Sequence, residues 1–196
     1  MVYLKLYIRL CHGYTKCKAQ LISRNIASTI VIDNKLKFAE SRKSGIRKAL
    51  SLNIEVGESN DVDDFWHVLE DNLGNRYNAK PVHTANEMKL LMSRFPNNIR
   101  LYVAKMNGEI VGGTLIYVTP QVVHTQYISA SVEGKKHGAL DLLFDYIINK
   151  VYANCRYFDF GKSTEQGGAY LNEPLIFQKE GFGGRGVCYD WYQWKL

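Results

Sequence analysis

Two spacings of hydrophobic residues divide this chain into predicted strands and helices. Alternation with a period of two, or a run of β-branched residues, predicts strands. The predicted strands cover residues 2–10, 26–32, 53–58, 101–105, 110–118, 122–130, 157–161 and 187–194. Hydrophobic residues three or four positions apart predict helices. The predicted helices cover residues 41–52, 65–73, 85–95, 139–152 and 173–180.

Short motifs fix several boundaries between these elements. Thr84 and Glu87 form a capping box in front of one helix, and Pro96 follows its last hydrophobic residue. Asn107-Gly108 predicts a tight hairpin between two strands. The elements together predict a mixed α/β domain that follows a short N-terminal piece.

Polar residues between and within these elements are predicted to face solvent. Residues 131–137 and 163–171 are polar and contain glycine, which favours loops. In the apolar helix over residues 139–152, Asp141, Asp145 and Asn149 recur four positions apart. This spacing predicts a single solvated stripe along that helix.

Composition places the chain among globular proteins of one domain, with 196 residues of which 46% are hydrophobic and 22% charged. No hydrophobic run approaches the roughly 18 residues of a membrane helix, and the N-terminus lacks the continuous apolar core of a secretion signal. Cys11, Cys17, Cys155 and Cys188 lack metal-binding spacing. They indicate reduced thiols in a cytoplasmic protein.

The net charge of +6 is unevenly distributed. Residues 1–60 carry 11 Lys or Arg against 4 Asp or Glu, a net of +7, whereas residues 61–196 carry 14 against 15. Residues 35–48 are the most basic segment. They form either the solvated face of a helix or a patch for an anionic partner such as a phosphorylated substrate, a lipid head group or tRNA.

Several enzyme classes lack their motifs here. The five histidines include no H-x-x-x-H pair, and the chain has neither a G-x-S-x-G elbow nor a Walker phosphate loop. What remains is a loop in which Lys135, Lys136, His137 and Gly138 precede a helix. Because the first N–H groups of a helix attract anions, this loop is either a phosphate site or a solvated turn.

Polar side chains inside two predicted strands are further candidates. The period of two predicts His124 and Gln126 on one face of a strand, and Thr125, Tyr127 and Ser129 on the other. Polar groups on both faces of a strand between apolar helices indicate either a site or local hydrogen bonds at a sheet edge.

Asp159 lies between Phe158 and Phe160, and alternation turns it to the face opposite both rings. A carboxylate inside a strand is seldom buried without a partner, so we expect Asp159 to be largely buried. Its expected partners are N–H groups of residues 161–168, unless it serves as a catalytic base. Asp159 and His124 are the two candidate bases.

Longer stretches resemble a known family. The chain is similar to the FemAB-like branch of the GNAT acyltransferase superfamily in the stretches NGEIVGGTLIYVTPQVVHTQYISAS, GALDLLFDYII, YFDFGKS and LNEPLIFQKEGFGGR. The basic helix SRKSGIRKAL resembles the segment by which such proteins enter their second GNAT-like domain. The resemblance covers about residues 20–196.

This resemblance implies a GNAT-like α/β fold, with a mixed and mainly antiparallel sheet flanked by helices and a short N-terminal appendage that contains a strand. FemAB-like chains usually carry two such domains. Residues 1–40 are therefore expected to be a remnant of a preceding domain or linker, and residues 41–196 the GNAT-like domain. The loop EGKKHGA matches the Q/R-x-x-G-x-G/A loop of acetyl-CoA enzymes only loosely.

The resemblance also implies an activity, the transfer of an acyl group from acetyl-CoA or another acyl-CoA to an amine without a metal. The acceptor would be a small molecule or a cell-wall or surface-polysaccharide precursor. Catalysis would fall to Asp159, His124 and Lys179, because Lys179 matches a FemAB lysine that steadies negative charge. The donor would contact Ser129, Lys135, Lys136, His137, Gly138 and Ala139, and the acceptor Gln126, Tyr127, Ser163, Glu165 and Arg185.

Two other functions stay open, namely an aminoacyl-tRNA-dependent transferase that builds peptidoglycan bridges and a non-catalytic truncated binding module. Residues 2–10 and 26–32 are predicted to form apolar strands, and we expect the domain that would cover them to be absent. We therefore expect a homodimer with much of its contact in residues 1–35, or a separately encoded first-half protein as the partner.

Overall fold

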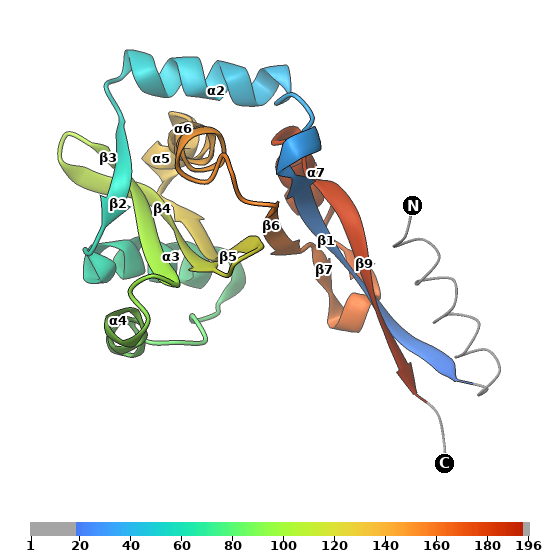
Figure 1. Cartoon of the computed structure of the whole chain (residues 1–196). Coiled ribbons are helices and arrows are strands. Elements are labelled where there is room, and N and C mark those ends of the chain that lie inside the picture. Colours follow the sequence, from blue (N-terminus) through green and yellow to red (C-terminus); the bar gives the residue numbers. More distant parts are fainter. Residues whose placement is uncertain (1–18, 194–196) are drawn as a thin grey trace.

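Seven strands form the main sheet of this protein. The computed structural model describes residues 19–193, so the strand predicted over residues 2–10 lies outside the described residues. The strand order is β2-β3-β4-β5-β6-β1-β9 (Figure 1). The strands are β1 (Gln20–Val31), β2 (Glu55–Ser59), β3 (Ile99–Met106), β4 (Glu109–Val118), β5 (Val122–Ala130), β6 (Tyr157–Lys162) and β9 (Arg185–Gln193). A small hairpin pairs β7 (Thr164–Glu165) with β8 (Tyr170–Leu171).

Helices lie on both faces of the main sheet. They are α2 (Glu40–Ser51), α3 (Val62–Tyr77), α4 (Ala85–Arg94), α5 (Val132–Lys136), α6 (Ala139–Tyr146) and α7 (Glu173–Gly181), with short turns η1 (Ile32–Asn34), η2 (Ile147–Val151) and η3 (Gln166–Gly168). α3 and α4 cover one face, whereas α6 covers the other and carries α2 on its outer side (Figure 1). This mixed α/β architecture confirms the predicted fold class.

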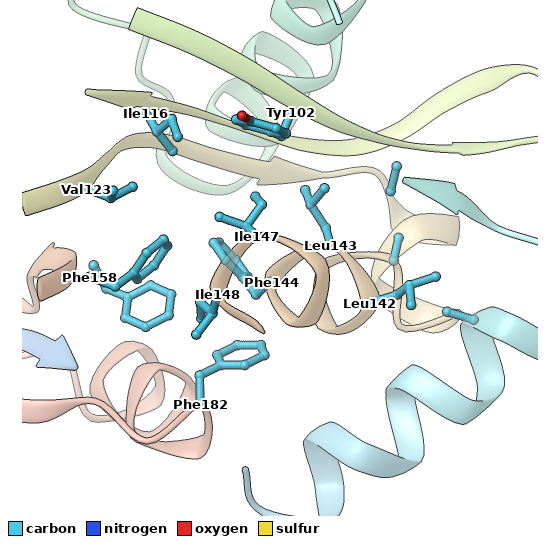
Figure 2. Packing of buried hydrophobic residues seen from close by; sticks show 14 of the residues in the cluster. Tyr102, Ile116, Val123, Leu142, Leu143, Phe144, Ile147, Ile148, Phe158 and Phe182 are labelled. Atoms are coloured by element: carbon cyan, nitrogen blue, oxygen red, sulfur yellow. The ribbon is translucent and has the colours of Figure 1, made fainter. Parts of the chain in front are cut away.

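A hydrophobic cluster stabilises each face of the sheet. On the α6 face, Phe144 and Ile147 pack with Phe158 of β6 and with Phe182, which follows α7 (Figure 2). On the other face, α3 and α4 pack against β3 to β5, and Phe65 is fully buried there. The sheet is therefore buried on both sides over β3, β4 and β5, which suits the hydrophobic residues in the middle of β3 and β4.

The local motifs have the predicted structures. Thr84 and Glu87 make both hydrogen bonds of the capping box at the start of α4. Asn107 and Gly108 both have positive φ, 52° and 84°, in the turn between β3 and β4. That conformation suits a two-residue hairpin because it matches the twist of the strands.

Near α6, one predicted loop is wrong, and one predicted helix is confirmed with a change in its last turn. Within the predicted loop over residues 131–137, Val132–Lys136 form the helix α5, which Ser131 caps by accepting a hydrogen bond from the N–H of Gly134. Gly134 serves close packing here, since a Cβ atom would lie 2.0 Å from the carbonyl oxygen of Val111. The predicted helix over residues 139–152 is α-helical to Tyr146 and then widens into the π-helical turn η2.

The first residue of the predicted solvated stripe, Asp141, is covered by α2. Asp141 is only 9% exposed, and it accepts a hydrogen bond of 2.7 Å from Arg42 of α2. Gly45 of α2 allows this approach, because a Cβ atom would lie 1.8 Å from the Asp141 carboxylate. Asp141 is therefore polar because it binds the basic helix α2, whereas Asp145 and Asn149 are half-buried.

The strand predicted over residues 26–32 lies inside the sheet. β1 pairs with β6 on one side and with β9 on the other, and Ala27 and Ile30 are buried. The expectation that this strand lacks cover is therefore wrong. Ser163 and Thr164 are also buried, although they were expected in an exposed loop. The division at residue 40 stays a prediction, and β1 joins the same sheet as residues 41–193.

None of the described helices combines the length and the hydrophobicity that a membrane span requires.

The contact between α2 and α6 predicts the effect of replacing Gly138, which has φ +74° and would place a Cβ atom 2.4 Å from the carbonyl oxygen of Gly45. We expect Gly138→Ala to lower the free energy of unfolding by about 2–4 kcal/mol, from overpacking and backbone strain. Gly74→Ala is the control, because a Cβ atom there meets nothing within 4 Å. It should stabilise α3 by about 0.5–1 kcal/mol in the same urea titration. Equal stability of the two variants would contradict the prediction.

Candidate active site

At the candidate site, the neighbouring strands β5 and β6 diverge after three paired residues. β5 and β6 run parallel, and their register ends at His124 opposite Asp159. Beyond this pair β5 continues to Ala130 beside β4 alone. A cavity of about 280 Å³ occupies the gap, lined by Ile128 of β5 and Phe160 of β6. The divergence of the strands thus creates a space in the middle of the sheet.

The lining of the cavity is mostly apolar. Hydrophobic side chains come from α6, α7 and the strands, with Leu140, Phe144 and Leu175 among them. The charged residues of the lining are Lys135 and Lys179, and the lining includes no Asp or Glu. The cavity therefore suits a ligand with an apolar body and a neutral or negatively charged group.

Lys179 occupies the wall between α7 and the end of β6. Its side chain is buried, and its Nζ donates to the carbonyl oxygens of Gly161 and Lys162 at 3.0 and 2.8 Å, and to Ser163 Oγ at 3.0 Å. Burial lowers the pKa of Lys179 to about 8, although nearby Asp159 acts in the opposite direction. Lys179 thus supplies hydrogen bonds to the end of β6 beyond its pairing with β5.

A row of polar side chains crosses three strands on the face opposite α6. Thr29 of β1, Asp159 of β6 and His124 of β5 are register partners. Asp159 accepts hydrogen bonds from Thr29 Oγ1 at 2.9 Å and from His124 Nδ1 at 2.7 Å. Asp159 is only 8% exposed, which confirms that it is largely buried. Its side-chain partners come from neighbouring strands, and the backbone N–H of Gly161 also donates to it, which confirms in part the partners expected from residues 161–168.

The ionisation of Asp159 orients the ring of His124. Burial acts to raise the pKa of Asp159, but the hydrogen bonds from His124 and Thr29 outweigh it, so this pKa lies below its ordinary value. An ionised carboxylate only accepts hydrogen bonds, so His124 Nδ1 carries the hydrogen. In the neutral ring, Nε2 is then the nitrogen with a lone pair. His124 therefore has the geometry of a general base held by a carboxylate.

A β-bulge at Gln126 changes which residues share a face. Ile116 of β4 pairs with Thr125 and Leu115 with Tyr127, so Gln126 is the extra residue. Val123 consequently packs in the α6 cluster and Tyr127 in the opposite one. The predicted alternation along this strand is wrong beyond Thr125, because a bulge reverses the order of faces.

The residues of the predicted anion loop do not act as one group. Lys135 lines the cavity. His137 pairs with Glu133 at 2.9 Å, and Lys136 lies 3.9 Å from the same carboxylate. Gly138 packs against Gly45, and Ala139 is fully buried. Of these five residues, Lys135 is the one whose side chain reaches the cavity.

The remaining predicted residues are spread over both faces. Ser129 lines the cavity and donates to the carbonyl oxygen of Val68. Tyr127 bonds through its hydroxyl to His83 Nδ1 at 2.6 Å. Ser163 binds Lys179, Glu165 accepts from Asn172, and exposed Arg185 donates to the carbonyl oxygen of Gly184. In the described part of the chain, no three His, Cys, Asp or Glu side chains gather in a potential metal site.

Sequence reasoning missed two contributors to the site. Thr29 orients Asp159, although the two residues are 130 positions apart. Asn72 of α3 lines the cavity and accepts a hydrogen bond from Lys135. No sequence signal marks either residue, because strand order and helix placement bring them to the site.

Comparisons with known proteins agree with this geometry. A family model described as "Acetyltransferase (GNAT) domain" matches residues 37–170. No curated protein sequence matches the chain significantly. Similar solved structures include L-PGS from Bacillus licheniformis, with a TM-score of 0.65 at 15% identity over 91% of this chain and 62% of that chain. FemX has a TM-score of 0.64 at 12% identity over 86% of this chain and 61% of that chain.

A third similar structure is a domain described as C-terminal in a lysylphosphatidylglycerol synthetase from Agrobacterium fabrum. It has a TM-score of 0.63 at 12% identity, over 91% of this chain and 62% of that chain. The chain thus spans about three fifths of the length of these structures. At such identities, the likeness shows a shared fold alone.

The buried hydrogen bonds of Asp159 predict its contribution to stability. We expect Asp159→Ala to lower the free energy of unfolding by about 1–3 kcal/mol at pH 7, because it leaves donors without an acceptor. Since the pKa of Asp159 is lowered in the folded state, its stabilising effect is present above about pH 4 and is lost as the pH falls through the folded pKa.

Urea unfolding at several pH values measures this difference. Asp71 on α3 is exposed, and Asp71→Ala provides the control, whose effect should stay within about 0.5 kcal/mol. A difference between wild type and Asp159→Ala that persists unchanged at pH 2.5 would contradict this assignment.

Proposed function

Because the chain belongs to the GNAT acetyltransferase domain family, we propose that it transfers an acyl group from an acyl-CoA to an amine. The acceptor is a small molecule or a cell-wall or surface-polysaccharide precursor. The observation that carries this proposal is the position of His124 and Lys179 on either side of Gly161, where the strands diverge. A Cβ atom on Gly161 would lie 3.2 Å from the ring of His124, while its carbonyl oxygen accepts from Lys179 at 3.0 Å.

The cavity fits the arm of such a donor. Its apolar lining, with Phe144 and Phe160, would hold the pantetheine chain, and Lys135 would face its charged part. An acyl-CoA supplies a thioester carbonyl carbon, to which the amine nitrogen bonds as the carbon–sulfur bond breaks and the thiol leaves. The protein then has to position the two substrates, to deprotonate the amine and to stabilise the negative charge that develops on the carbonyl oxygen.

Each ionisable residue then has one task. His124 Nε2 takes the proton that the amine loses, and Asp159 stabilises the resulting imidazolium through the bond to Nδ1. Lys179 places a positive charge beside the carbonyl oxygen, where negative charge develops in the transition state. Its hydrogen bonds to the end of β6 hold that charge in place.

An aminoacyl-tRNA donor is the alternative, and two observations favour acyl-CoA over it. The cavity lining contains lysines but no carboxylate, so it offers no counter-charge to the ammonium of an aminoacyl group. In the basic helix α2, Arg42, Lys43 and Lys48 are bound within the chain, to Asp141, Glu40 and the carbonyl oxygen of Lys136. This leaves fewer lysines and arginines for nucleic acid than the sequence indicated.

Replacing His124 tests the assignment of the base. With acetyl-CoA and a panel of aminosugars and diamines as acceptors, we expect His124→Ala to lower kcat about 10²- to 10⁴-fold while KM for the donor changes little. His67→Ala is the matched control, because His67 is exposed on α3. Full kcat in the His124 variant would refute the assignment. Transfer from aminoacyl-tRNA but not from acyl-CoA would refute the assignment of acyl-CoA as the donor. Tight binding of acyl-CoA without any transfer would favour a non-catalytic binding module.

The ionisation of Lys179 leads us to expect that kcat falls on the alkaline side of its pH profile. Because the pKa of Lys179 is about 8, its positive charge is lost as the pH rises through 8, and kcat should fall there. Lys179→Met should be slower at pH 7 and should lack this fall, whereas Lys136→Met should behave as wild type. The measurement is kcat between pH 6 and 10 with a saturating acceptor. A wild-type rate that keeps rising through pH 9 would contradict the role of this charge.

A further inference from the structure

The outer edge of the sheet is formed by β9. β9 is the last strand in the sheet order, and no other strand in residues 19–193 pairs with its outer side. The ribbon of β1 and β9 extends beyond the helices that cover the rest of the sheet (Figure 1). An edge of this length presents backbone N–H and C=O groups to which another strand can bind.

A hydrophobic stripe follows one face of this edge strand. Val187, Tyr189 and Trp191 alternate along β9, and their side chains are 44%, 43% and 63% exposed. Residues 185–193 contain no proline and no lysine, which are the residues that commonly block edge pairing. The carboxylate of Asp190 is engaged by Arg24 across the ribbon and is not directed outward as a blocking charge.

We propose that β9 pairs with β9 of a second copy of this chain, antiparallel and about a two-fold axis at Tyr189. In this register Tyr189 lies opposite itself, and Val187 lies opposite Trp191 on both sides of the axis. The stripe is thus complementary to itself, as a two-fold interface requires. Aromatic and β-branched residues are favourable partners across antiparallel strands.

Charges also fit this register. Arg185 lies opposite Gln193, and Cys188 opposite Asp190, so like charges do not face each other. β1 offers less edge than β9, because residues 20–29 of β1 pair with β9 and residues 27–31 pair with β6 on the other side. The partner therefore binds β9 and not the strand over residues 26–32 that the sequence indicated.

The pairing extends the face that carries the candidate base. Arg185 of β9 is the register partner of Thr29 of β1. Thr29 is in turn the partner of Asp159 of β6, and Asp159 is the partner of His124 of β5. These four side chains lie in one row across β9, β1, β6 and β5. In the dimer, Gln193 of the partner subunit adds a polar side chain to the end of this row.

Oligomeric state tests the proposal directly. Analytical ultracentrifugation of the full chain at 5–100 μM should give twice the monomer mass of 22.4 kDa. Tyr189→Lys places two lysines opposite each other at the axis and should raise the dissociation constant at least tenfold. Leu90→Lys is the control, because Leu90 is 50% exposed on α4, away from β9. A monomeric wild type, or a dimer unaffected by Tyr189→Lys, would overturn the proposal.

Disulfide trapping tests the register. In a background with Cys11, Cys17 and Cys188 changed to serine, Tyr189→Cys should form a covalent dimer on mild oxidation. Residues opposite each other in an antiparallel pair have Cα atoms about 4.5–5.5 Å apart, within reach of a disulfide. Trp191→Cys should not, because its copies would lie about 13 Å apart along the strands. Trapping by Trp191→Cys but not by Tyr189→Cys would overturn the register.

Discussion

The separation of β5 from β6 is the constraint on which the rest of this structure depends. Strands that part inside a sheet leave carbonyl groups without their ladder partners, and such groups are costly when buried. Lys179 offsets this loss, because its ammonium group donates hydrogen bonds to two carbonyl oxygens at the end of β6. The same buried ammonium lines the cavity that the separation opens. One side chain therefore both stabilises the gap and gives it a positive charge.

The helices on the α6 face stabilise the separation of β5 from β6. Phe144, Phe158, Phe160 and Phe182 pack edge to face or stacked between α6, β6 and α7. α2 then closes over α6 through Gly45, Gly138 and the ion pair of Arg42 with Asp141. In the basic helix α2, Arg42 and Lys48 thus bind other parts of the fold. Burial raises the pKa of Asp141, whereas Arg42 lowers it, so the ionised form of Asp141 depends on Arg42.

The two faces of the sheet have different roles in the proposed reaction. The cavity beside α6 and α7 suits the donor, and the row of Thr29, Asp159 and His124 faces the opposite side. Gly161 connects them, because its φ of +70° and its missing side chain let His124 approach the end of β6. A side chain at this position would push the proposed base away from the point where the strands diverge.

The sequence by itself determined the elements and their class. Period, caps and turn residues located each strand of the main sheet and every described α-helix except the short α5, since these signals act within a few residues. It also identified Asp159 and His124 as candidates, because a polar residue inside an apolar strand pattern stands out locally, whereas Lys179 became a candidate through the family resemblance. Only the tertiary structure decided their partners. Thr29 reaches Asp159 through strand order, the bulge at Gln126 reverses the faces, and α2 buries Asp141, which was predicted to be solvated. Each of these depends on contacts between residues that are distant in the chain, on which local spacing carries no information.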